Sequence, residues 1–190
     1  KQSYDFPFER KNSLSIDGWK ELIHKCSESI PKSLLTDLVT NLIEDLQKTL
    51  YFCEKNWPFH LPKGFIHADM FPDNVFFLND NISGVIDFYF SCSDILTYDL
   101  AVAVNAWCFN EHNFFDSKKY DSLLEGYNSE RKLNQDEILY LPLLSQAASM
   151  RFLLTRLYDW VNTPEDADVI PKDTKEYIIK LKHFTKIVEK

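Results

Sequence analysis

The chain has 190 residues, of which 45% are hydrophobic and 15% aromatic, enough to bury one sizeable core. Its net charge of -8 argues against a nucleic-acid backbone or an anionic membrane as partner, because like charges repel. Its four cysteines form no CxxC pair, no signal peptide opens the chain, and no apolar run is long enough to span a bilayer. These features predict a cytoplasmic protein with reduced thiols rather than a zinc-binding or secreted one.

The first third of the chain predicts two helices. Residues 1–14 show no period. Apolar residues then recur at helical spacing over residues 15–26, with Ser15 as a suitable N-cap. A second helix is expected after Pro31 and ends at the two prolines and the glycine of residues 55–64. Its apolar face is formed by Leu34, Leu35, Leu38, Leu42, Leu46 and Leu50.

The middle of the chain changes to a β-type pattern. Residues 64–67, GFIH, predict a short strand, and a loop follows. Residues 74–78, NVFFL, and residues 84–90, GVIDFYF, flank the turn signal LNDNISG and predict a hairpin. Asp87 then lies at the far end of the second arm.

Helical periodicity returns after this segment. Helices are expected over residues 94–109, 117–128 and 174–190, and a long one from about Asn134. Asn134 and Glu137 form a capping-box pattern, while Pro142 would kink the long helix or move its start. The sequence therefore predicts a single, mostly helical α+β domain over residues 1–190.

The polar residues of the middle segment form a chemical pattern, H-x-D-x-x-x-x-N, spelled HADMFPDN, with an Asp thirteen residues further on. Buried acids are costly unless they are compensated, and bound metal and phosphate would compensate them. Phosphoryl transfer needs a carboxylate to orient and deprotonate the acceptor hydroxyl, which fits Asp69. It also needs hard oxygen ligands for Mg²⁺, which fits Asn74 and Asp87.

This pattern resembles the catalytic loop and metal-binding segment of the aminoglycoside-phosphotransferase-like kinases, relatives of protein kinases. Tyr89 stands where the protein-kinase D-F-G motif has glycine, which favours the small-molecule branch. Within that branch, four blocks are similar to the homoserine kinases: GFIHADMFPDNVFF, GVIDFYFSCSD, YDLAVAVNAWCF and RFLLTRLYDW. The match covers roughly residues 60–165.

The resemblance implies a kinase C-terminal lobe that phosphorylates the hydroxyl of L-homoserine with ATP and Mg²⁺. By it, Asp69 is the base, Asn74 and Asp87 are metal ligands, Asp99 holds the loop through its backbone, and His67 packs and orients the loop. Nothing in residues 1–64 resembles the β-rich N-terminal lobe of such kinases. The sequence thus predicts that this lobe is missing, so that the chain alone is inactive.

The acceptor site is less defined by the sequence. An amino-acid substrate calls for an acid and an arginine. Arg151 or Arg156 could bind the substrate carboxylate, or could instead pair with one of the acids Asp94, Asp99 and Asp159. Asp94 could bind the ammonium group or cap the helix that follows it. Tyr89 and Trp107 could wall the pocket or be plain core.

Three other interpretations remain open. The same fold could phosphorylate choline, an aminoglycoside or methylthioribose. His67 and Asp69 with a distal histidine, His112 or His183, would match the iron triad of a non-haem oxygenase. An isolated lobe could also be a binding or dimerisation module, because an exposed apolar face seeks a partner. The sequence leaves the oligomeric state open.

Overall fold

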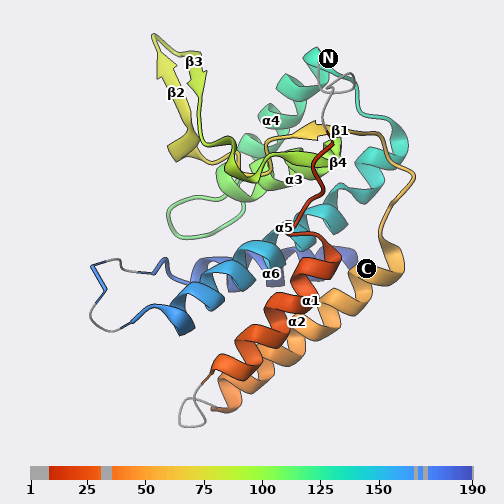
Figure 1. The fold of residues 1–190 in the computed structure, drawn as a ribbon. Coiled ribbons are helices and arrows are strands. Elements are labelled where there is room, and N and C mark those ends of the chain that lie inside the picture. Colours follow the sequence, from red (N-terminus) through yellow and green to blue (C-terminus); the bar gives the residue numbers. More distant parts are fainter. Residues whose placement is uncertain (1–8, 31–35, 165–166, 169–170, 190) are drawn as a thin grey trace. The chain divides into compact units, whose positions relative to one another are not determined.

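The computed structural model describes residues 9–30, 36–164, 167–168 and 171–189 (Figure 1). The chain divides into two units. The first comprises Lys1–Asn12 and Pro58–Ala148, and the second Ser13–Trp57 and Ser149–Lys190. The expectation of one domain over residues 1–190 stays a prediction, and each unit is described by itself.

The first unit contains two small antiparallel sheets. Strand β1 (Lys63–Ile66) pairs with β4 (Cys92–Ile95), and β2 (Val75–Leu78) pairs with β3 (Asn81–Val85). The β2–β3 hairpin has an irregular register between Phe76 and Phe77. The hairpin and the first strand were predicted, but β4 was not. Four residues that include an Asp and lead directly into an apolar helix give no strand signal of their own.

Two short 3-10 turns, η3 (Pro72–Asn74) and η4 (Phe88–Phe90), lie on either side of the hairpin. The following helix, α3 (Leu96–Trp107), begins two residues later than the sequence predicted, because Asp94 and Ile95 belong to β4. Most of α3 is buried, as its apolar composition indicated. Helix α4 (Ser117–Glu130) is capped by Asp116, whose carboxylate accepts hydrogen bonds from the backbone of Lys118 and Lys119.

Helix α5 (Gln135–Asn162) begins with the predicted capping box. The Asn134 side chain accepts a hydrogen bond from the Glu137 backbone at 2.8 Å, and the Glu137 carboxylate accepts one from the Asn134 backbone at 3.0 Å. Pro142 lies inside the helix and does not move its start.

Among the described helices, α5 is also long and apolar enough, by length and composition alone, to cross a membrane. The sequence had predicted no such segment. Most of the apolar window is buried inside the protein, which is the usual situation of a core helix, so the finding is weak evidence for a membrane span.

The second unit is helical in its described part. Helices α1 (Ile16–Ser29) and α2 (Asp37–Asn56) run antiparallel to one another (Figure 1). With them belong the C-terminal half of α5 and α6 (Lys175–Val188). The Trp19 and Trp57 rings meet edge to face with centroids 5.5 Å apart, and the Cys26 thiol lies 3.9 Å from the Leu154 carbonyl oxygen.

The predicted starts of α1 and α2 are correct only in part. Ser15 occupies the N-cap of α1, but its side chain makes no capping hydrogen bond. Helix α2 is capped by Thr36, whose side chain accepts a hydrogen bond from the Val39 backbone. Leu46 and Leu50 of the predicted leucine face are buried. Leu34 and Leu35 lie outside the described residues, as does the side chain of Leu38.

Candidate active site

The candidate site lies in the segment between β1 and β4, whose ends the pairing of Ile66 with Cys92 brings together. The carboxylate of Asp99, on the first turn of α3, accepts hydrogen bonds from the backbone N–H of His67 at 3.0 Å and of Ala68 at 2.7 Å. Ala68 has a φ of 63°, a left-handed conformation that is strained for a residue with a side chain. The two hydrogen bonds from the loop to Asp99 hold this bend immediately before Asp69.

His67 joins the two arms of the segment. Its Nδ1 accepts a hydrogen bond from the Asp69 backbone at 3.2 Å, and its Nε2 lies 2.9 Å from the Ile86 carbonyl oxygen. These partners require the tautomer with the proton on Nε2. Both ring nitrogens are thus used within the loop, an arrangement suited to a histidine that orients the loop.

Asn74 is bound to Asp69. Its side-chain Nδ2 donates to the Asp69 backbone carbonyl at 2.8 Å and to the Asp69 Oδ2 at 3.3 Å. Because the amide nitrogen makes both hydrogen bonds, the amide oxygen is the atom of Asn74 that could bind a cation. Asn74 is buried, and its backbone carbonyl accepts a hydrogen bond from Ile86 at 3.0 Å. The residue before Asp87 is thereby fixed against Asn74.

Asp87 ends this hairpin arm in an unusual conformation. Its φ of 61° and ψ of 65° are left-handed, and its carboxylate accepts a 3.4 Å hydrogen bond from the Tyr89 backbone. The residue is exposed. Left-handed non-glycine residues concentrate at functional sites, where the surrounding structure maintains the strain.

These side chains offer hard oxygen donors to a metal. Among the described residues, no group of three or more His, Cys, Asp or Glu side chains could hold a metal ion. The Asn74 amide oxygen and the Asp87 carboxylate would supply only two protein oxygen donors. Such a pair suits Mg²⁺, which is usually held by one or two carboxylates and completes its shell with water and phosphate oxygens.

The two predicted wall residues, Tyr89 and Trp107, have different surroundings. The Trp107 indole Nε1 donates to the Met70 carbonyl at 2.9 Å, so Trp107 holds the loop after Asp69. Tyr89 is 71% exposed, which excludes a core position, and the Arg10 guanidinium lies 5.9 Å from its ring centroid.

Asp94 does not cap α3, as one interpretation of the sequence had it. Within the described residues no side chain caps this helix, whose N-cap position is Ile95. The Asp94 carboxylate instead accepts hydrogen bonds from the Asn12 side chain at 2.6 Å and from the Ile95 backbone at 2.7 Å. Asp94 thus ties the segment before Ser13 to β4, which the sequence did not indicate.

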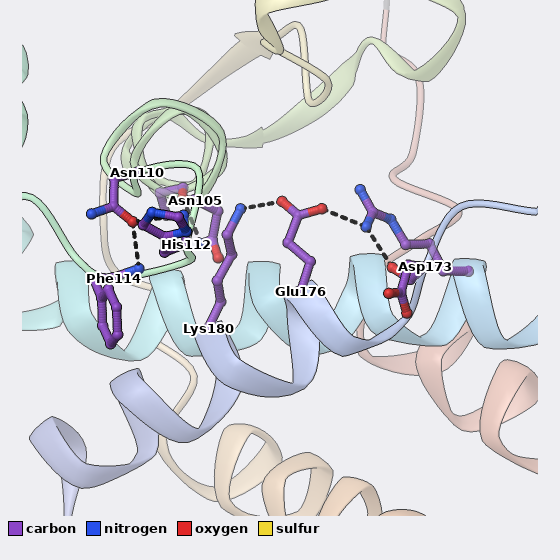
Figure 2. Close-up of polar contacts among 9 residues, drawn as sticks. Asn105, Asn110, His112, Phe114, Asp173, Glu176 and Lys180 are labelled. Atoms are coloured by element: carbon purple, nitrogen blue, oxygen red, sulfur yellow. Dashed lines mark hydrogen bonds and ion pairs between the residues drawn. The ribbon is translucent and has the colours of Figure 1, made fainter.

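Arg156 belongs to the second unit and pairs with an acid that the sequence had not suggested. Its Nη1 donates to the Glu176 carboxylate at 2.6 Å and to the Asp173 carbonyl at 2.8 Å. Glu176 also forms an ion pair with Lys180, so one carboxylate joins two cations (Figure 2). Burial would raise the pKa of Glu176, but the hydrogen bonds from Lys180 and Arg156 hold it below its ordinary value.

Arg151 lies in the same unit and is buried, with its guanidinium 4.3 Å from the centroid of the Phe152 ring. Both arginines therefore have partners within the second unit, and neither is among the residues of the first unit around Asp69.

Comparison with known proteins decides the family. The model of the phosphotransferase enzyme family, APH, matches residues 3–133. The chain belongs to this phosphotransferase family. The match includes the loop of Asp69, the β2–β3 hairpin and α3. It confirms the resemblance that the sequence motifs predicted.

The chain is similar to proteins named homoserine kinase. It is 45% identical over 183 residues to that of Rhizobium meliloti, covering 96% of this chain and 55% of the relative. It is 48% identical over 178 residues to that of Parvibaculum lavamentivorans, covering 94% and 54%. The chain thus spans about half the length of the curated relatives it matches.

A solved structure confirms the fold class. The chain matches an ethanolamine kinase of Plasmodium vivax with a TM-score of 0.55 at 16% identity, covering 95% of this chain and 51% of that one. At this identity the likeness concerns the fold alone. The mostly helical fold with small antiparallel strand pairs is therefore as the sequence predicted.

Glu137 is a buried carboxylate of the first unit, and the sequence predicted only its role in the capping box. Glu137 is 1% exposed and accepts hydrogen bonds from the Thr97 hydroxyl at 2.6 Å and from Arg131 at 2.5 Å, besides that from Asn134. Burial would raise the pKa of Glu137, but these hydrogen bonds hold it below its ordinary value. The capping-box spacing was the one sequence signal for this residue, and it gave no sign of Thr97, forty residues away.

Proposed function

We propose that this chain is the catalytic-loop and acceptor part of a kinase that transfers the terminal phosphoryl group of ATP to the hydroxyl of L-homoserine. The observation that carries the proposal is the pairing of Asn74 with Asp69 in a loop held by Asp99. It occurs in a chain 44% to 48% identical to proteins named homoserine kinase. Phosphoryl transfer is chiefly positioning and charge stabilisation, which this loop is built to supply.

In this proposal Asp69 accepts the proton of the substrate hydroxyl as that oxygen attacks phosphorus. Asn74 orients the Asp69 carboxylate through its amide nitrogen. The Asn74 amide oxygen and the Asp87 carboxylate would hold Mg²⁺, which supplies charge neutralisation at the phosphate oxygens. His67 and Asp99 keep the backbone of the loop in its bend and do not touch the substrate.

The substrate contacts remain predictions. Arg151 and Arg156 are candidates for the homoserine carboxylate, Asp94 for its ammonium group, and Tyr89 and Trp107 for the pocket wall. A contact to the carboxylate predicts that Arg151→Lys or Arg156→Lys raises KM for homoserine without changing KM for ATP, since lysine lacks the bidentate fork. Steady-state kinetics with each substrate varied in turn would decide between the two arginines.

The decisive experiment measures ADP release by a protein of the relatives' full length that contains these residues. With Mg²⁺ and ATP, homoserine should be a far better acceptor than choline, ethanolamine, an aminoglycoside or methylthioribose. Asp69→Asn should lower kcat by about a thousandfold, within the range for loss of a general base. Asp73→Asn, which changes an exposed acid of the same loop, is the matched control and should leave kcat unchanged.

Two results would refute parts of this proposal. If choline or another alcohol is used as well as homoserine, the acceptor is wrong although the phosphotransferase chemistry stands. If Asp69→Asn keeps the full rate, the assignment of the base is wrong.

The length of the chain adds a separate proposal. Because the chain spans about half of its relatives, the nucleotide-covering lobe of such kinases is expected to come from residues beyond it. The 190-residue chain alone should then release little or no ADP with homoserine. Equal turnover by this chain and by the longer protein would contradict this.

An alternative is that the isolated chain serves as a binding or dimerisation module. The exposed apolar side chains of the β2–β3 hairpin favour it, because such surfaces associate. Sedimentation of the 190-residue chain over a range of concentrations tests whether it dimerises, and a purely monomeric result would exclude the dimerisation module.

A further inference from the structure

The carboxylate of Glu137 connects three helices of the first unit. Its Oε2 accepts the Asn134 backbone N–H, which closes the capping box at the start of α5. Its Oε1 accepts two more hydrogen bonds, from the Thr97 hydroxyl of α3 and from Arg131, the residue that follows α4. A capping box needs only the first of these contacts, so the other two call for a separate explanation.

Thr97 lies on the first turn of α3, which begins directly after β4. The first turn of a helix has backbone N–H groups without helical partners. No side chain in the described parts of the chain caps this turn. In this turn the Leu96 backbone donates a hydrogen bond to the Pro62 carbonyl at 3.0 Å, and the Thr97 hydroxyl donates one to the Glu137 carboxylate at 2.6 Å. Thr97 and Glu137 are 0% and 1% exposed.

The same turn carries the acid that holds the candidate catalytic loop. Asp99 follows Thr97 by two residues, and side chains two apart on a helix point in roughly opposite directions. Thr97 reaches Glu137, while Asp99 reaches the backbone N–H groups of His67 and Ala68. A rotation or fraying of this turn would therefore move the Asp99 carboxylate away from the loop.

The loop depends on that carboxylate because of its backbone conformation. Ala68, with its φ of 63°, keeps a strained bend only while its surroundings fix it. The base proposed above, Asp69, is the next residue in the chain.

We infer that Thr97 and Glu137 are positioning residues, which hold the start of α3 so that Asp99 can fix the bend at Ala68 and thereby the direction of Asp69. Neither residue touches the substrate. The kinetic consequence of this inference rests on the proposed function, but its structural consequence does not.

The structural test compares Thr97→Val, which keeps the shape but removes the hydroxyl, with Thr97→Ser, which keeps the hydroxyl. Hydrogen exchange is followed at the amides of His67 and Ala68 in the full-length protein. Thr97→Val should exchange about tenfold faster at these amides, while Thr97→Ser should resemble the wild type, as expected for loss and retention of a supporting contact. Amides of α1, in the second unit, are the internal reference and should not change.

The kinetic test uses the same pair of variants. Thr97→Val should lower kcat for homoserine about tenfold, as the loss of outer supporting contacts usually does, with KM for ATP unchanged. Thr97→Ser should restore kcat. If Thr97→Val does not fold, Glu137→Gln replaces it in both tests, because it keeps the size of the side chain but weakens its hydrogen bonds to Arg131 and Thr97.

The two failures can be told apart. A wild-type protein that does not phosphorylate homoserine overturns the proposed function and leaves the exchange test in force. An active wild type whose Thr97→Val variant keeps both kcat and amide protection overturns the inference. A uniform rise in exchange over both units also overturns it, since that indicates general destabilisation rather than positioning.

Discussion

The acids of the candidate site differ in how their oxygens are satisfied. Asp99 accepts two backbone hydrogen bonds from the loop, and Asp94 accepts hydrogen bonds from Asn12 and Ile95. Asp87 is exposed and accepts a long hydrogen bond from the residue two ahead. Mg²⁺ is usually held by one or two carboxylates together with water and phosphate oxygens, and an exposed carboxylate such as that of Asp87 is accessible to such an ion. This difference supports the proposal that Asp99 holds the loop and that Asp87 binds the metal, while Asp94 stays a candidate for the ammonium group.

The four cysteines are expected to be unreactive in the folded protein. All four are buried, and burial raises the pKa of Cys53 to about 12 and that of Cys26 and Cys108 to about 11. At pH 8 a thiol with a pKa near 11 is about one part in a thousand thiolate, the reactive form. Ellman's reagent should therefore label the native protein very slowly and all four thiols in guanidinium chloride. Rapid stoichiometric labelling of the native protein would contradict this prediction.

Glu137 should contribute to the acid sensitivity of the fold. Its folded pKa lies below its ordinary value because donors from Thr97, Arg131 and Asn134 outweigh the effect of burial. A depressed carboxyl pKa stabilises the fold above the unfolded pKa, and this contribution is lost as the pH falls through the folded pKa. Urea unfolding between pH 3 and pH 7 should thus give a flatter acid branch for Glu137→Gln than for the wild type.

Glu125→Gln is the matched control for this measurement, because Glu125 is exposed on α4. Its unfolding free energy should follow that of the wild type at every pH. Parallel curves for Glu137→Gln and the wild type would show that Glu137 has no such role.

At the scale of elements, the short β1–β4 pair closes the functional segment. The pairing of Ile66 with Cys92 brings together the two ends of a 67–91 segment that contains the loop, the hairpin and η4. Asp69 and Asp87 each lie within a few residues of this pair. This short strand pair therefore fixes the positions at which the 67–91 segment begins and ends.

Helix α1 begins at a close backbone contact that only glycine permits. A Cβ built on Gly18 would lie 1.9 Å from the Ser13 carbonyl oxygen, a backbone atom that cannot move aside cheaply. Gly18→Ala should therefore lower the free energy of unfolding by about 1–3 kcal/mol, the usual cost of overpacking. Thermal unfolding measures the change.

Gly126 on α4 is the control, because a Cβ there would meet no atom within 4 Å. Gly126→Ala should raise the free energy of unfolding by about 0.5–1 kcal/mol, since alanine loses less backbone entropy in a helix. Equal shifts in Tm for the two variants would mean that the contact at Gly18 does not matter.

At the scale of the molecule, the β2–β3 hairpin presents an apolar surface. Phe76 and Phe77 are just over half exposed, and Leu78 and Ile82 are 66% exposed. Large exposed apolar patches promote association. The double variant Leu78→Thr/Ile82→Thr should reduce both binding of an apolar dye and self-association of the chain. Its unfolding free energy should change by less than about 0.5 kcal/mol, because the side chains are exposed.

Leu139→Gln on α5 gives the comparison, since Leu139 is 70% exposed on another element. This variant should leave dye binding and association nearly unchanged. If it reduces them as much as the hairpin variant does, the effect belongs to exposed apolar side chains in general and not to the hairpin.

The sequence by itself determined the local features of this protein. Helical periodicity, the Asn134–Glu137 capping box and the hairpin signals all depend on residues a few positions apart, and the structure has each of them. The loop pattern from His67 to Asn74 likewise indicated the correct family, because the residues that carry its chemistry lie within one short stretch of sequence.

Only the tertiary structure decided which distant groups meet. Strand β4 forms because β1 lies beside it, and Asp94 is bound by Asn12, 82 residues earlier. Arg156 forms an ion pair with Glu176, and Glu137 accepts a hydrogen bond from Thr97, forty residues before it. A polar side chain with several suitable partners pairs with the one that the packing of apolar faces brings within hydrogen-bonding distance. That packing depends on the whole chain, so no short stretch of sequence reveals it.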